Sequence, residues 1–146
     1  MKLYKEPLPE SLNWIEFHVD PVIGKKVDIP EELEEGEKMP EYETIRICLR
    51  YLRIKELNEM QDDVYNINAE LKGRRTGKVT SKFNYSLFME KKMETAIVEW
   101  ENITDEEGNL VEVSMENIRL LPGWIGESLV EIIDEMNDLG PEILGE

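Results

Sequence analysis

Hydrophobic and polar residues alternate over two segments of the chain. The first is "NWIEFHV", which starts at Asn13, and the second follows Tyr42. In the second segment every other position is apolar: Ile45, Ile47, Leu49 and Tyr51. A period of two predicts strands at about 14–19 and 42–52, and the second strand should have one polar face.

Apolar residues at intervals of three or four predict helices over 53–66, 84–100 and 124–138. The first stripe consists of Ile54, Leu57, Met60 or Gln61, and Val64. The second consists of Tyr85, Phe88, Met89, Met93, Ala96, Ile97 and Trp100. The third consists of Ile125, Leu129, Ile132, Ile133 and Met136. Ser114 is a candidate N-cap for a short additional helix that ends before Pro122.

Two segments lack either period. Residues 1–13 contain Pro7 and Pro9 and should form an extended arm, and residues 20–40 form an acidic, proline-containing loop with the run "EELEEGE". The 146 residues therefore predict a single α+β domain, 1–146. We expect a small antiparallel sheet, with 109–113 as a candidate third strand, packed against three to four helices.

The stretch "DEEGN" lies in a segment whose side chains approach the spacing of a calcium-binding EF-hand loop. The matching residues are Asp105, Glu107, Asn109 and Glu116. The sixth position of such a loop needs glycine for its sharp turn, but here it is Leu110, and Gly108 comes earlier. We therefore predict a tight acidic turn and no metal site.

The chain carries a formal net charge of −16, which repels nucleic acid and anionic membranes. This excess serves solubility, or it forms a surface that attracts a basic protein or mimics nucleic acid. The basic residues gather in "ELKGRRTGKVTSK", predicted to be an exposed loop: Lys72, Arg74, Arg75, Lys78 and Lys82. Its glycine spacing does not match a phosphate-binding loop. The alternatives are a solvated loop or a site for an acidic partner.

The residues do not point to an enzyme. His18 and Cys48 are each the only residue of their type, so neither a zinc set nor a Cys–His nucleophile motif can be assembled. We expect no cofactor. The absence of a leader-like start and of an apolar run of about 18–20 residues predicts a cytoplasmic protein without a membrane span.

Four stretches between residues 85 and 139 carry a resemblance to a known family: "AIVEW", "DEEGN", "SMENIRLL" and "WIGESLVEIIDEM". In this order they resemble the small tail assembly chaperones and related tail-region proteins of long-tailed bacteriophages and prophages. The earlier "TIRICLRYLRIKELNEM" is similar to the strand-to-helix step of such chains. The acidic section 20–40 and the basic loop at 72–82 depart from that pattern.

The resemblance implies a non-enzymatic role in tail morphogenesis in the bacterial host. Such a chaperone coats the helical tape-measure protein, recruits tail-tube subunits and acts as a homo-oligomer. The side chains expected to bind these partners are Met89, Met93, Trp100, Trp124, Leu129, Ile133 and Met136. Each of them could instead belong to the core. The rival function is an acidic inhibitor or nucleic-acid mimic that binds a DNA-binding enzyme.

Overall fold

The computed structural model describes residues 1–3, 5–76 and 83–137, with side chains described outside 66–76. Its sheet has three antiparallel strands in the order β1-β2-β3: β1 (Asn13–Val19), β2 (Glu43–Leu49) and β3 (Ile97–Glu101). A 3-10 turn, η1 (Pro9–Ser11), precedes them. The helices are α1 (Ile54–Thr76), α2 (Tyr85–Ala96), α3 (Met115–Ile118) and α4 (Gly123–Met136). The predicted α+β class is confirmed.

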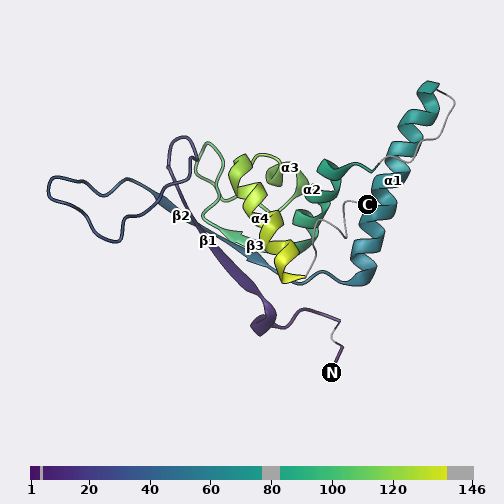
Figure 1. The fold of residues 1–146 in the computed structure, drawn as a ribbon, viewed down its shortest axis with the longest axis horizontal. Coiled ribbons are helices and arrows are strands. Elements are labelled where there is room, and N and C mark those ends of the chain that lie inside the picture. Colours follow the sequence, from purple (N-terminus) through teal and green to yellow (C-terminus); the bar gives the residue numbers. More distant parts are fainter. Residues whose placement is uncertain (4, 77–82, 138–146) are drawn as a thin grey trace.

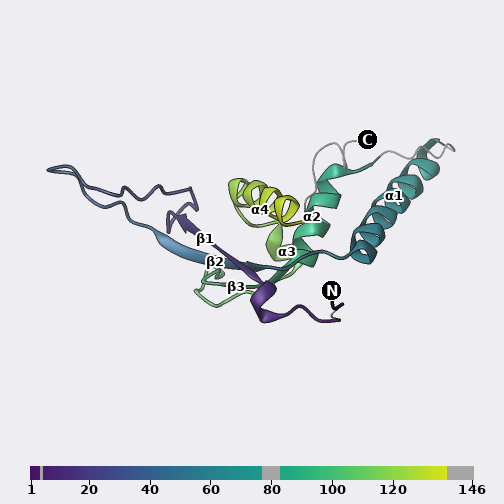
Figure 2. The same cartoon turned by 60° about the horizontal axis from the view of Figure 1, so that its bottom comes forward.

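The helices α2, α3 and α4 lie on one face of the sheet, whereas α1 lies beyond its end and packs against α2 (Figures 1 and 2). The acidic segment between β1 and β2 projects away from the helices (Figure 1). Apart from an isolated bridge between Val19 and Lys26, its described residues 20–42 form no strand or helix. This matches the irregular loop that its prolines predict.

The core lies between the sheet and the helices. In the register of β1 and β2, Ile15 is opposite Ile47 and Phe17 is opposite Ile45, so these side chains share one face. The helices cover that face with the buried side chains of Phe88, Met93, Ala96, Ile118, Ile125, Leu129 and Ile133. The period-two prediction is confirmed for the inward faces of β1 and β2, and so is the inward stripe of the last helix. For Tyr51 it is wrong, because β2 ends at Leu49 and Tyr51 is 54% exposed, and the outer face of β2 is not wholly polar, because Cys48 is buried beside a register shift.

The third strand corrects two predictions. We expected a helix over 84–100 and a candidate strand at 109–113, but α2 ends at Ala96 and β3 begins at Ile97. Ile97 and Val98 are β-branched and favour a strand, and this segment pairs with β2 through Leu49–Ile97 and Ile47–Trp100. Residues 109–113 contribute only an isolated bridge, between Thr104 and Leu110.

The helix α1 continues to Thr76, beyond the predicted end at 66. Ala69, Glu70 and Leu71 are good helix formers, and the single Gly73 costs only about 1 kcal/mol in a helix interior. The predicted basic loop is therefore wrong for Lys72, Arg74 and Arg75, whose backbone belongs to α1. Lys78 and Lys82 lie outside the described residues.

An ion pair fixes the passage from β2 to α1. Arg50 donates through Nη1 to Glu56 Oε1 at 2.9 Å and pairs through Nη2 with Glu56 Oε2. Glu56 Oε1 also accepts from the backbone amide of Arg53 at 3.0 Å, which caps the first turn of α1. The hydrogen bond from Arg50 is the main reason that the pKa of Glu56 lies below its ordinary value of 4.5.

This pair predicts a pH-dependent contribution to stability. A carboxylate whose folded pKa is lowered stabilises the fold above its unfolded pKa and loses that contribution as the pH falls through the folded pKa. We expect Glu56→Gln to unfold more easily than the wild type at pH 7, and the difference to shrink as the pH drops below 4.5. Urea unfolding of both proteins across this range measures it; a difference that stays constant with pH would contradict the role of the pair.

Candidate functional site

The acidic segment "DEEGN" forms the predicted tight turn. Asp105 Oδ1 accepts from the amides of Glu107 at 2.9 Å and Asn109 at 3.0 Å, and the Asp105 amide donates to the Asn109 carbonyl at 2.8 Å. Gly108 has φ +86°, a left-handed conformation that glycine adopts without strain. The Asp105 carboxylate is therefore used to hold the turn, which confirms the structural interpretation of this stretch.

The segment after the turn is anchored at both ends. Trp100 Nε1 donates to the carbonyl of Val111 at 2.8 Å, which ties the segment to β3. Ser114 Oγ accepts from the amide of Asn117 at 3.2 Å, so the predicted N-cap of α3 is confirmed. The Asn117 side chain donates back to the Glu112 carbonyl at 2.8 Å. The acidic turn and the start of α4 are thus held at fixed places on either side of α3.

The structure places most of the predicted partner-binding side chains in the core. Met93, Leu129 and Ile133 are buried. Three others are half-buried and pack against the core: Trp100, Trp124 and Met136. Met89 is 39% exposed and is the most accessible of the set. No partner is present to test a binding role, which stays a prediction, but these residues do not form one exposed patch.

Trp124 connects α4 to the turn that follows β1. Its Nε1 donates to the carbonyl of Gly24 at 2.9 Å, and its ring meets Phe17 edge-to-face with the centroids 5.7 Å apart. Gly24 itself has φ +71°, and a Cβ added there would meet Pro122 at 3.1 Å. This close contact fixes the turn at 20–24 beside the start of α4.

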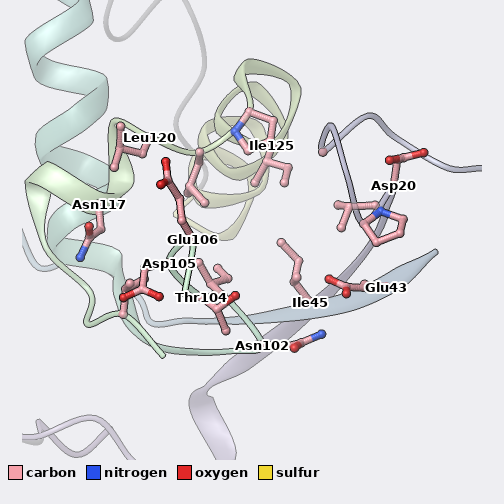
Figure 3. A pocket seen from close by; sticks show the side chains of 17 residues that line it. Asp20, Glu43, Ile45, Asn102, Thr104, Asp105, Glu106, Asn117, Leu120 and Ile125 are labelled. Atoms are coloured by element: carbon pink, nitrogen blue, oxygen red, sulfur yellow. The ribbon is translucent and has the colours of Figure 1, made fainter. Parts of the chain in front are cut away.

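A groove of about 450 Å³ opens where these pieces meet. Its walls come from the end of β1 and the turn after it, the start of β2, the acidic turn, and the junction of α3 and α4 (Figure 3). We call it the acidic groove. Its lining consists of Val19, Asp20, Pro21, Gly24, Glu43, Ile45, Asn102, Ile103, Thr104, Asp105, Glu106, Val111, Asn117, Leu120, Leu121, Pro122 and Ile125.

The acidic groove combines an apolar interior with a negative rim. Ile45 points from β2 toward α4, and the side chains of Glu43 and Glu106 lie on opposite sides of Ile45 (Figure 3). With Asp20 and Asp105, four carboxylates line the groove, and no lysine or arginine is among the described residues that line it. Its volume falls in the range of roughly 300–1,000 Å³ that is typical of ligand-binding clefts.

Two of the rim carboxylates are held by the backbone. Asp20 Oδ1 accepts from the amides of Val22 at 2.8 Å and Ile23 at 3.0 Å, as Asp105 does in its own turn. These amide hydrogen bonds lower the pKa of Asp20, and the charge of Lys25 lowers it further to a smaller extent. Asp20 is therefore negatively charged at neutral pH and presents its charge from a defined position.

Exposed apolar side chains lie in the lining of the groove and in the turn beside it. Leu120 lines the groove and is 78% exposed. Val22 and Ile23 follow Asp20 and Pro21 in the neighbouring turn, and they are 87% and 72% exposed. Apolar side chains that gather at an opening, with polar groups around them, are typical of a surface that binds another molecule.

The chain also contains a buried ion pair that the sequence did not reveal. The side chain of Lys92 on α2 is 1% exposed, and its Nζ lies 2.7 Å from Asp134 Oδ1 on α4. The same ammonium lies 5.1 Å from the ring centroid of Phe88. The pair joins α2 to α4 inside the helical layer.

Cys48 and His18 are both placed by the structure. Burial raises the pKa of the Cys48 thiol, which makes it a poor nucleophile at neutral pH. His18 Nδ1 lies 3.1 Å from Thr44 Oγ1, on the neighbouring strand β2. Within residues 1–3, 5–76 and 83–137, no three His, Cys, Asp or Glu side chains are placed to hold a metal ion. None of the helices described here has the length and apolar composition needed to cross a bilayer.

Comparison with known proteins gave no match: no protein-family model, no curated protein and no solved structure is significantly similar to this chain.

Proposed function

We propose that this chain is a non-enzymatic protein-binding protein of phage or prophage tail morphogenesis, and that it acts as a tail assembly chaperone in the bacterial host. The observation that carries the proposal is the acidic groove, an apolar cleft with four carboxylates and exposed Leu120 at its mouth. A cleft of this composition suits a protein segment that must keep its apolar side chains out of water.

The order of the sequence stretches that resemble tail chaperones supports the same proposal. "DEEGN" builds one wall of the groove, and "SMENIRLL" with the beginning of "WIGESLVEIIDEM" builds another. Three of the four stretches that carry the resemblance therefore contribute residues to the cleft. A net charge of −16 supports the role as well, because it keeps an assembly with an apolar partner in solution and speeds the approach of basic subunits.

The proposal is tested by co-expressing the chain with the tape-measure and tail-tube proteins encoded beside it. The tape-measure protein should remain soluble and co-purify with the chain, and it should aggregate when expressed alone. A tape-measure protein that stays equally insoluble in the presence of the chain would contradict the proposal.

An acidic inhibitor or nucleic-acid mimic is the second candidate, favoured by the exposed acidic run at residues 31–37 in the loop between β1 and β2. The salt dependence of the binding affinity distinguishes the two functions. A mimic binds its enzyme through exposed charges and should lose affinity steeply between low and high salt, because counterions screen such charges. A chaperone that binds through buried apolar contacts should keep most of its affinity.

A further inference from the structure

We propose that the acidic groove binds a protein segment that presents a large apolar side chain with lysine or arginine on both sides of it. This inference rests on the proposed function, because it names the kind of segment that such a chaperone would hold.

The interior of the groove fits an apolar side chain. Ile45, Val111 and Ile125 reach it from β2, from the segment before α3, and from α4. About 450 Å³ of space is enough for one or two large aliphatic side chains, and their transfer from water to this interior is favourable. A fully charged ligand would lose its hydration among these groups without compensation.

The rim selects basic neighbours for that side chain. Glu43 and Glu106 make no ion pair or side-chain hydrogen bond with the rest of the described chain, although both line the groove. Asp20 and Asp105 stand in fixed positions through their backbone hydrogen bonds. Lysine or arginine on either side of the apolar residue would meet these carboxylates at the mouth, where the charges complement one another.

The surroundings favour a polypeptide over a small cation. Leu120 lines the groove and is 78% exposed, and the turn beside it carries the exposed side chains of Val22 and Ile23, so a ligand longer than one side chain has further apolar surface to bury. Nucleic acid is disfavoured because it is repelled by the net charge of −16. A second copy of this chain would bring two acidic rims together, which costs free energy.

The test uses the full-length chain and a short fluorescein-labelled peptide with a central pair of leucines and two lysines on each side. Binding is followed by fluorescence anisotropy. We expect saturable binding, and we expect it to fall below detection when the lysines are replaced by glutamate or the leucines by serine.

Two variants test whether the peptide binds at the groove. Removing two rim charges with Glu43→Gln and Glu106→Gln should weaken binding about tenfold at low salt and less at high salt. Leu120→Ser should weaken it by about tenfold at any salt, because the lost contact is apolar. Leu120 is exposed, so this change should leave the fold intact.

Matched controls change the same groups elsewhere. Glu131→Gln with Glu135→Gln removes the same charge from exposed positions of α4 that do not line the groove, and Ile54→Ser removes an apolar side chain that is 79% exposed on α1. Binding should be nearly unchanged in both.

If the controls weaken binding as much as the groove variants do, or if the peptide does not bind, the inference is wrong. A drop in self-association caused by Leu120→Ser would assign the groove to a second copy and would also overturn it.

The outcomes separate this inference from the proposed function. A chain that keeps the tape-measure protein soluble equally well with and without the groove substitutions would be a chaperone that uses another surface. A chain that binds the lysine-flanked peptide through the groove but does not act on tail proteins would retain the site and lose the proposed function.

Discussion

Replacing Asp134 by alanine is expected to lower the free energy of unfolding by about 3 kcal/mol, because it leaves a buried ammonium without its carboxylate. Lys92 is 1% exposed and its Nζ lies 2.7 Å from Asp134 Oδ1, so water cannot easily replace the lost partner. Replacing both residues by apolar ones, with Lys92→Met and Asp134→Leu, should restore most of the stability, since it removes the buried ammonium together with its half-buried partner. Urea unfolding of the three proteins measures these differences.

The neighbouring pair of Lys91 and Asp63 provides the control. Its atoms are 3.8 Å apart and the Asp63 side chain is 60% exposed, so Asp63→Ala should cost no more than about 0.5 kcal/mol. If Asp134→Ala proved as mild as Asp63→Ala, Lys92 would not be buried as described, and the packing of α2 against α4 would need revision.

Leu129→Ala is expected to lower the free energy of unfolding by about 3 kcal/mol, because it removes buried methyl groups and leaves a cavity in the core. Leu129 is 0% exposed. Leu120 is the matched control at 78% exposure, and Leu120→Ala should change stability by less than about 0.5 kcal/mol. Both are measured by urea unfolding, with binding of the lysine-flanked peptide measured in parallel.

Leu129→Ala and Leu120→Ala together distinguish a residue of the core from a residue of the binding surface. The sequence predicted partner binding for Leu129, whereas the structure buries it and places Leu120 at the mouth of the groove. If Leu129→Ala left stability unchanged and abolished binding, the stripe of α4 would have to be accessible to a partner, as the sequence first indicated.

The spacing of hydrophobic residues correctly predicted the strands and helices whose type depends mainly on their own residues. The alternation in β1 and β2 and the stripe of α4 each match their structures, because one face of each element is buried. The cap at Ser114 and the turn at Asp105 were also predictable, since both depend on residues within a few positions.

Features that depend on distant residues could not be predicted in this way. The stripe of Met93, Ala96, Ile97 and Trp100 continues through the end of α2, so only pairing with β2 distinguishes the strand that begins at Ile97. The burial of Lys92 depends on Asp134, far along the chain. The acidic groove could not be predicted from the sequence either, because its walls come from four separate segments of the chain.

The most direct test of the proposed binding site is an NMR titration of the isotopically labelled full-length chain with its partner segment from the tape-measure protein. We expect the largest chemical-shift changes at groove residues, among them Ile45, Glu106 and Leu120, with little change on α1. Changes confined to the acidic run at residues 31–37 would contradict binding at the groove and favour a charge-based mimic. Changes spread over the buried stripe of α4 would mean that the partner opens the core.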